Sequence, residues 1–153
     1  MDPERLSPDD PRIAPTLALL QRVFAEMDGR INPPSSMHRM SLAALTDIAA
    51  TGGLWVMGDS PVATMTLQPK GDTLYVSKLA VASDRRGQGL ARRLLTCAAA
   101  KARESGLSAL QLQSRIELTE THAAFFALGF VRTGKSAHAG FDHPTSITLR
   151  KAL

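Results

Sequence analysis

Three short apolar runs joined by two tight turns constrain this chain more than any other feature. The runs are Leu54–Met57, Val62–Leu67 and Thr73–Val81, and the sequences between them are Gly-Asp-Ser-Pro and Pro-Lys-Gly-Asp. Glycine, proline, aspartate and serine are typical of turns, and connections this short join neighbouring antiparallel strands. We therefore expect an antiparallel meander in the middle of the chain.

Two helices are expected upstream of the meander. Apolar residues recur at helical spacing before Gly29, and Ser41 is placed to cap a second helix that ends at Gly52. The prolines Pro33 and Pro34 between them indicate a loop. The apolar side chains expected to be buried are Leu17, Leu20, Phe24 and Met27 in the first helix and Leu42, Leu45 and Ile48 in the second.

Helix and strand patterns alternate downstream of the meander. The expected elements are a helix over Gly89–Glu104, a strand over Leu107–Ser114, a short helix over Thr121–Leu128, and strands over Phe130–Thr133 and Ser146–Arg150. The buried positions of the first of these helices are Leu90, Leu94, Ala98 and Ala102. The order ααβββαβαββ indicates a mixed α/β or α+β domain around one sheet.

Length and composition fit one globular domain over residues 1–153. The chain is 44% apolar and 21% charged, which suffices for a core and excludes a mainly disordered or fibrous class. Its N-terminus is acidic and proline-rich without an apolar h-region, and no apolar run approaches the ~18–20 residues of a membrane span. We therefore expect a cytoplasmic protein. The single Cys97 excludes an intramolecular disulfide, and its apolar helical setting favours a buried, inert thiol.

The positive charge of the chain is concentrated in one segment. The formal net charge is +4, but seven positive and two negative residues lie between Lys78 and Glu104, so this segment carries 7 − 2 = +5 and the remainder 4 − 5 = −1. A local cluster of cations suggests a local anion.

A glycine-containing junction in this segment is suited to phosphate. The strand ending at Val81 leads through Arg85, Arg86, Gly87 and Gly89 into a helix. The first amides of a helix have no partner within it, and the helix dipole favours negative charge there. The glycines tolerate positive φ and allow close approach of a ligand. The junction therefore predicts a phosphate site, the alternative being a tight turn with solvated arginines.

Two common phosphate motifs do not fit this junction. No GxxxxGK[ST] run occurs, which excludes a Walker A loop. The dinucleotide pattern G-x-G-x-x-G is incomplete because Arg92 stands at its third glycine, and Gln111 and Gln113 occupy the next strand where an acidic residue is needed.

The sequence Arg86-Gly87-Gln88-Gly89-Leu90-Ala91 resembles the R/Q-x-x-G-x-G/A pyrophosphate loop of the GCN5-related N-acetyltransferase (GNAT) family. Lys78-Leu79-Ala80-Val81 resembles the end of that family's fourth strand, and Phe125 to Phe130 resembles its short helix followed by Leu-Gly-Phe. The resemblance extends from about Ala14 to the C-terminus. It implies a GNAT-like acyl-CoA N-acyltransferase fold with a mixed, mostly antiparallel sheet and helices on both faces. Because MDPERLSPDD shows no alternation, we expect the first strand to be short or missing.

The resemblance also implies an acetyl-CoA site and direct transfer, without a metal. The residues expected to bind the cofactor are Leu79, Ala80, Val81, Arg86, Gly87, Gln88, Gly89, Leu90, Ala91 and Phe125. Amides of the glycine loop would hold the pyrophosphate, and an amide near Leu79 or Ala80 would polarise the thioester carbonyl. A primary amine of a small-molecule or amino-acid-like acceptor would then attack in a ternary complex.

The acid and base of the reaction are less clearly marked in the sequence. Many family members have a tyrosine at the position of Phe125, which has no hydroxyl to protonate the departing thiolate. Tyr75 is the only tyrosine, with a half-buried strand aromatic as the alternative interpretation. Glu117, Glu120 and His122 are candidates for taking the proton of the acceptor amine, the alternative being solvated loop carboxylates and a helix N-terminal histidine.

Candidates for acceptor recognition lie in two loops. Asp28, Arg30 and His38 belong to the region that walls the acceptor pocket in the family, with surface placement as the alternative. The connection between the last two strands is expected to fold over the site, which makes His138 a specificity candidate. Its histidines and aspartate match no metal signature.

Two other functions are weighed against acetyl transfer. Phe125 and the lack of an obvious base motivate a catalytically silent acyl-CoA-binding module. Nucleic-acid binding is disfavoured because the basic segment has no aromatic residue to stack on a base. We therefore expect a small-molecule partner rather than nucleic acid or membrane, and a homodimer is an expectation from the family.

Overall fold

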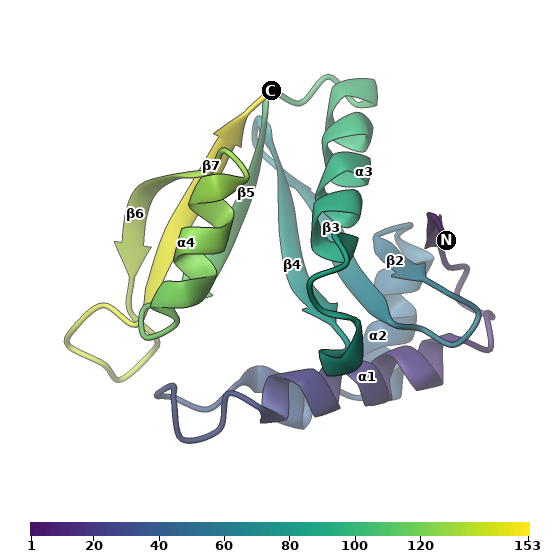
Figure 1. The fold of residues 1–153 in the computed structure, drawn as a ribbon, viewed down its shortest axis with the longest axis horizontal. Helices are drawn as coiled ribbons and strands as arrows, with labels where there is room; N and C mark the ends of the chain where they lie inside the picture. The colour runs from purple at the N-terminus through teal and green to yellow at the C-terminus, as the bar shows by residue number, and fades with distance from the viewer.

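Seven strands form one sheet in the order β1-β2-β3-β4-β5-β7-β6 in the computed structural model, which describes residues 1–153 (Figure 1). The strands are β1 (Pro3–Arg5), β2 (Leu54–Met57), β3 (Ala63–Lys70), β4 (Thr73–Val81), β5 (Ala109–Arg115), β6 (Val131–Ser136) and β7 (Ser146–Ala152). All neighbours pair antiparallel except β4 and β5, which are parallel. The predicted meander and the mixed, mostly antiparallel sheet are confirmed.

Helices cover both faces of this sheet, as predicted. They are α1 (Ile13–Ala25), α2 (Leu42–Ala50), α3 (Leu90–Glu104) and α4 (Thr119–Ala127), with 3₁₀ turns η1 (Ser36–Arg39) and η2 (Ser83–Arg85). Leu54 and Val56 of β2 belong to the core beneath α1 and α2, whereas Trp55 and Met57 belong to the core beneath α3. This alternation follows from the two-residue period of a strand. No helix combines the length and the apolar character needed to cross a membrane.

Local sequence signals predicted most of the helices and strands, but they did not predict the burial of every side chain correctly. Ser41 caps α2 as expected, its hydroxyl accepting from the Ala44 amide at 3.0 Å. All four predicted core positions of α3 are buried, and β1 is present but only three residues long. The expectation that Leu42 is buried is wrong: it is 48% exposed at the first position of α2, where Leu45 and Ala49 face the core instead. Cys97 is half-buried against the core, and burial raises the pKa of its thiol.

A β-bulge in β4 changes which side chains face each core. Thr64 of β3 pairs with Ala80, but Thr66 pairs with Ser77, so Lys78 and Leu79 together lie opposite the single residue Met65. Leu74 and Val76 therefore join the core beneath α3, whereas Ala80 joins the core beneath α1. One extra residue in a strand reverses the facing of everything after it.

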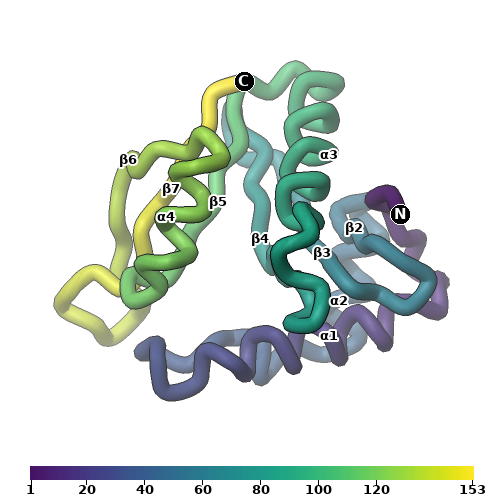
Figure 2. The backbone as a smooth tube through the Cα atoms, viewed as in Figure 1, coloured from purple at the N-terminus to yellow at the C-terminus, as the bar shows by residue number.

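Strands β4 and β5 diverge after only three paired positions. The last pair is Tyr75–Gln111, and residues 76–81 of β4 continue without a partner from β5. The tube view shows this wedge opening downward, with α1 and the segment that follows it lying across the open end (Figure 2). The start of α3 lies at the same end. The fold therefore creates an opening in the middle of its own sheet.

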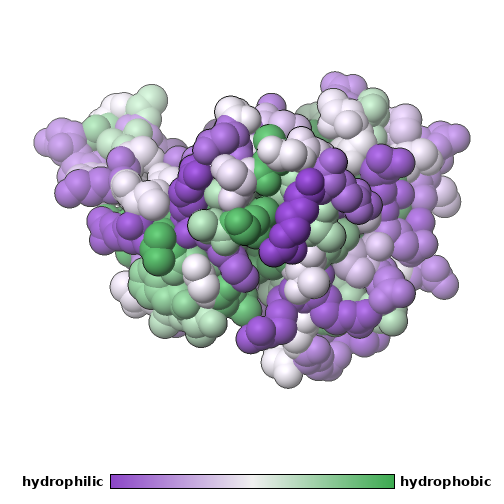
Figure 3. All heavy atoms as spheres, turned by 90° about the horizontal axis from the view of Figure 1, so that it is seen from above, coloured by the Kyte–Doolittle hydropathy of each residue, from purple (hydrophilic) through white to green (hydrophobic).

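The outer surface is mainly hydrophilic when viewed from above (Figure 3). Hydrophobic atoms gather toward the left and centre of that view, on the side where α4 lies. The exposed large apolar residues on this side of the molecule are Phe126 at 47% and Val131 at 59%.

Candidate functional site

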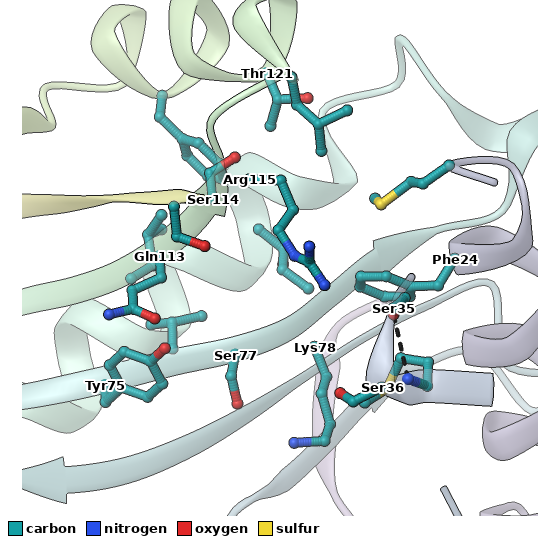
Figure 4. Close-up of a pocket in the computed structure, with 18 of the residues that line it drawn as sticks. Phe24, Ser35, Ser36, Tyr75, Ser77, Lys78, Gln113, Ser114, Arg115 and Thr121 are labelled. Carbon is teal, nitrogen blue, oxygen red and sulfur yellow. Dashed lines mark hydrogen bonds between the residues drawn. The ribbon is translucent and has the colours of Figure 1, made fainter. Parts of the chain in front are cut away.

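A cavity of about 290 Å³ fills the wedge between β4 and β5. Its walls are residues 75–79 of β4 and 112–115 of β5, together with side chains from four other segments (Figure 4). Those side chains are Phe24, Met27, Ser35, Ser36, Met37, Leu118, Thr121, Phe125, His138 and Ser146. The site thus combines a split sheet with α4, the α1–α2 connection and the β6–β7 loop.

The bulge places a strained residue on the cavity wall. Lys78 has φ +53°, the only non-glycine residue of the chain with positive φ, and it lines the cavity. This conformation costs a lysine about 1–2 kcal/mol, and such strain is concentrated at functional sites. Burial lowers the pKa of the Lys78 amine, which has no hydrogen bond or ion pair within the chain.

The predicted glycine loop lies at the open end of the wedge. Gly87 and Gly89 have φ +78° and +77°, and a Cβ at either position would meet no atom within 4 Å. Their conformation, rather than crowding, therefore requires glycine. Gly89 is the N-cap of α3 and provides no side-chain cap. The amides of residues 86–92 donate no hydrogen bond within the chain, so they are free to bind an anion.

The predicted cofactor residues differ in the exposure of their side chains and in their contacts. Arg86 is exposed and pairs with Glu26 at the end of α1, its Nη2 lying 2.7 Å from the carboxylate. Gln88 is exposed, Ala91 is half-buried and Leu90 anchors α3 in the core. On β4, Leu79 lines the cavity, whereas Ala80 and Val81 pair with Thr64 and Ala63 of β3.

Arg115 brings a guanidinium into the cavity from the end of β5. Its Nη1 donates to the Pro33 carbonyl at 2.6 Å and its Nη2 to the Pro34 carbonyl at 3.2 Å. In Figure 4 the side chain crosses from β5 toward Phe24 and Ser35. Burial lowers the pKa of this guanidinium, and no carboxylate forms an ion pair with it. These bonds fix the α1–α2 connection as one wall of the site.

His138 enters the cavity from the β6–β7 loop. Its Nδ1 is hydrogen-bonded to the Thr145 hydroxyl, which also accepts the His138 amide at 2.8 Å. The pKa of the imidazole is lowered by burial first and then by the positive charge of Arg115, while Glu117 opposes the shift. A neutral imidazole can accept a proton.

Tyr75 and Phe125 are the two aromatic candidates of the sequence, and both line the cavity. Tyr75 lies at the narrow end, where β4 and β5 still pair, and burial raises the pKa of its hydroxyl. Lys70 lies 4.0 Å from the centre of its ring. Phe125 packs edge-on against Phe130, with ring centres 5.6 Å apart. The cavity therefore contains a phenolic hydroxyl, on β4 rather than on α4.

Six other candidates do not line the cavity. His122 is 92% buried, and its Nε2 is hydrogen-bonded to the Arg115 carbonyl at 2.8 Å, which ties α4 to the end of β5. Glu117 accepts the Asn32 amide at 3.0 Å. Glu120 pairs with Arg30, and Asp28 pairs with the His38 Nε2 at 2.7 Å. The Asn32–Glu117 and Arg30–Glu120 contacts join the α1–α2 connection to the start of α4, outside the cavity lining.

Three parts of the cavity are not predicted by the sequence: Arg115, the side chain of Lys78, and the wall formed by Phe24, Met27 and Ser35–Met37. Phe24 and Met27 continue the apolar stripe of α1, which predicts that both are buried in the core. Phe24, in the last turn of α1, does pack against the core beneath α1 but also lines the cavity, and Met27 lies beyond the end of the helix at Ala25; both side chains are only half-buried. The one feature of the sequence that points to a role for Arg115 is its position, because it is a basic residue at the end of the strand that follows α3.

The remaining basic residues and the histidines of the β6–β7 loop have other environments. Arg92 and Arg103 line a second cavity of about 220 Å³ together with Lys151. Arg93 pairs with Asp2, and Lys101 with Glu104. His143 pairs with its neighbour Asp142, and no group of three potential ligands is close enough to hold a metal ion.

The comparisons with known proteins agree with this geometry. The model of the Acetyltransferase (GNAT) family matches residues 17–130. This match covers most of the chain, which therefore belongs to the GNAT acetyltransferase family. No curated protein matches the sequence.

Solved structures share the fold at low sequence identity. The PaiA N-acetyltransferase of Thermoplasma acidophilum, in complex with coenzyme A, superposes with a TM-score of 0.82 at 10% identity over 99% of this chain and 98% of that one. A GNAT-family acetyltransferase of Staphylococcus aureus Mu50 gives 0.72 at 12% identity over 98% of both chains. Ard1 of Thermoplasma volcanium gives 0.70 at 15% identity over 99% of this chain and 96% of that one. The predicted GNAT-like fold is confirmed.

Proposed function

We propose that this protein transfers the acetyl group of acetyl-CoA to a primary amine of a small-molecule acceptor. The observation that carries the proposal is the wedge between β4 and β5, because it joins a row of unpartnered amides at residues 86–92 to a cavity at the bulge. The coenzyme A bound to the Thermoplasma acidophilum PaiA enzyme supports this use of the fold. The co-substrate would supply an activated acetyl group.

The residues present fit such a co-substrate. Unpartnered amides and the positive end of the α3 dipole suit a pyrophosphate, and the part of β4 that has no partner in β5 suits the amides of a pantetheine arm. In the reaction, the amine nitrogen forms a bond to the acetyl carbon while the carbon–sulfur bond breaks. An amide of the strained Lys78–Leu79 bulge would polarise the carbonyl.

Two cavity side chains are suited to the proton transfers. We assign the base to His138, because a neutral imidazole facing the acceptor wall can take the proton that the amine must lose. We assign the acid to Tyr75, because its buried phenol stays protonated at neutral pH and can donate to the departing thiolate. Glu117 and His122 have other partners and no place in this scheme.

A thiol-release assay tests the proposal. Purified protein with acetyl-CoA should release free CoA in the presence of at least one class of acceptor from amino acids, polyamines, aminoglycosides and peptides. Direct binding of acetyl-CoA should be measured in parallel by calorimetry. Saturable binding with no release for any acceptor would instead establish the silent acyl-CoA-binding module.

A further inference from the structure

The charge of the cavity lining is one-sided. Of the 19 residues that line the cavity, Lys78, Arg115 and His138 are basic or titratable to a cation, and none is aspartate or glutamate. Cavities that receive polyamines or other polycations need carboxylates for charge complementarity, and this one provides the opposite.

Arg115 and Lys78 have no counter-ion within the chain. Arg115 donates only to two neutral carbonyls, so three of the five N–H groups of a guanidinium (5 − 2) remain available. Lys78 forms no ion pair and no hydrogen bond, and its amine is partly buried. Burying a cation without an anion is unfavourable, and both groups have lowered pKa values for that reason.

The nearest carboxylate does not resolve this imbalance. Glu117 is close enough to influence the charges of Arg115 and His138, but it is exposed, accepts the Asn32 amide and does not line the cavity. The phosphates of acetyl-CoA do not resolve it either, because the loop proposed to bind them comes after β4 and none of its residues lines the cavity. The pantetheine arm carries no charge.

The rest of the acceptor wall is apolar. Phe24 lines the cavity from the last turn of α1, Met27 and Met37 line it from the α1–α2 connection, and Leu118 lines it from the N-cap of α4. Arg115 is hydrogen-bonded to the same connection, so its free donors and this apolar wall belong to one side of the site. An acceptor matching both features has an anionic group beside an apolar body.

We propose, on the basis of the proposed acetyl transfer, that the acceptor is a small amine that also carries a carboxylate, such as an α-amino acid with an apolar side chain. Arg115 binds the carboxylate, and the charge of Lys78, whose side chain points away from the guanidinium in Figure 4, adds to the positive potential of the cavity. This places the amino group toward the thioester and within reach of His138. Arg115 is then a specificity-determining residue rather than a catalytic one.

Matched acceptors test this inference. Leucine and phenylalanine are compared with leucinamide and phenylalaninamide, which keep the amine and side chain but lose the negative charge, and with the polyamine spermidine. Because charge-assisted hydrogen bonds are stronger than neutral ones, we expect kcat/KM for the acids to exceed that for the amides by about 10- to 100-fold.

Variants then assign the preference to named residues. Arg115→Gln also removes the two hydrogen bonds to the wall, so both series should lose activity, but kcat/KM for the acids should fall at least about tenfold further than that for the amides. Lys78→Gln, which removes no hydrogen bond, should lower kcat/KM for the acids and change that for the amides by less than about threefold. Arg132→Gln, at an exposed arginine of β6 outside both cavities, is the matched control. Acetyl-CoA affinity should be unchanged in all of them.

The outcomes separate this inference from the proposed function. If no acceptor of the wider panel releases CoA, the proposed function fails and the inference falls with it. If aminoglycosides or peptides release CoA and the amino acids do not, acetyl transfer stands and the carboxylate site is overturned. If the amides or spermidine are used as well as the acids, or if Arg115→Gln and Lys78→Gln lower activity on acids and amides equally, acetyl transfer stands and the carboxylate site is overturned.

Discussion

The glycine loop and the acceptor cavity are built in different ways. The loop is local: residues 86–92 are consecutive, and their backbone amides provide the site. The cavity is assembled from residues far apart in the sequence, since Arg115 is bonded to Pro33 and Pro34, more than eighty positions away. A site made of consecutive backbone leaves a motif, whereas a site made of converging side chains does not.

The two regions also differ in how firmly they are held. The acceptor side is joined across elements by Arg115, by the Asn32–Glu117 hydrogen bond and by the Arg30–Glu120 pair. The glycine loop makes one ion pair, Arg86–Glu26, between two exposed side chains. A ligand bound to the loop would supply partners that the protein itself does not provide.

The largest expected effect is a loss of acetyl-CoA binding caused by a change in the glycine loop. In Gly89→Trp a tryptophan must adopt a backbone φ of +77°, and its indole covers the unpartnered amides. Because several charge-assisted hydrogen bonds to the phosphates are then lost, we expect acetyl-CoA affinity to fall on the order of 10³-fold. Calorimetry measures this directly. Gly71→Trp is the control, since Gly71 also has positive φ and open space but lies in the β3–β4 turn. Equal affinity in both variants would mean that the loop does not bind phosphate.

The next effect belongs to the acceptor side alone. His138→Ala should lower kcat/KM about 100-fold at neutral pH, the usual contribution of a general base, without changing acetyl-CoA affinity. His143→Ala, in the same loop but exposed and paired with Asp142, should change neither. A loss of cofactor binding in His138→Ala would contradict the division between the two regions.

The pH dependence of the wild-type protein sharpens the assignment of the base. The pKa of His138 is lowered below its ordinary value of 6.5, so the imidazole is neutral at pH 7 and charges only when the pH falls through that lowered pKa. We expect kcat/KM to decline on the acid side below pH 6.5, and this limb to vanish in His138→Ala. A limb that persists in the variant would assign it to another group.

A smaller effect is expected from restoring a hydroxyl on α4. Phe125 lines the cavity, so Phe125→Tyr adds a second hydroxyl there; because Tyr75 is assigned as the acid, kcat should change by less than about threefold. A rise of about tenfold or more would mean that protonation of the thiolate limits turnover and would contradict the assignment to Tyr75. Phe126→Tyr places the same hydroxyl on the exposed side of α4 and should have no effect. An unchanged rate in Phe125→Tyr, together with a loss in Tyr75→Phe, would show that Tyr75 already supplies the proton.

The smallest effect is expected at the ion pair between the regions. Arg86→Ala removes a pair whose side chains are 50% and 41% exposed, so the free energy of unfolding should fall by less than about 1 kcal/mol. Urea denaturation measures this change. A loss well above that value would show that Arg86 organises the loop in the absence of ligand.

The sequence predicted features that depend on local pattern. The burial of every fourth residue in α3 depends only on the geometry of that helix, as seen at Leu90, Leu94, Ala98 and Ala102. The cap formed by Ser41 depends only on the first turn of α2. The glycine loop belongs to the same class. In each case the conformation is determined by interactions among a few adjacent residues.

Other features could not be predicted because they depend on non-local contacts. The bulge at Lys78 is defined by the pairing of β4 with β3, and nothing in the residues of β4 requires it. Phe24 continues the apolar stripe of α1, but its position in the last turn of the helix places it against the cavity. His122 has a sequence position suited to catalysis, but the Arg115 carbonyl is its partner.

Amide hydrogen exchange with and without coenzyme A tests the central claim most directly, namely that the loop before α3 binds the cofactor's phosphates through its backbone. The amides of residues 86–92 have no partner in the free protein and should exchange rapidly. Saturating coenzyme A should slow their exchange at least about tenfold, by supplying the missing acceptors, and leave the β3–β4 turn unchanged. Saturable binding that leaves the exchange of residues 86–92 unaltered would contradict the account.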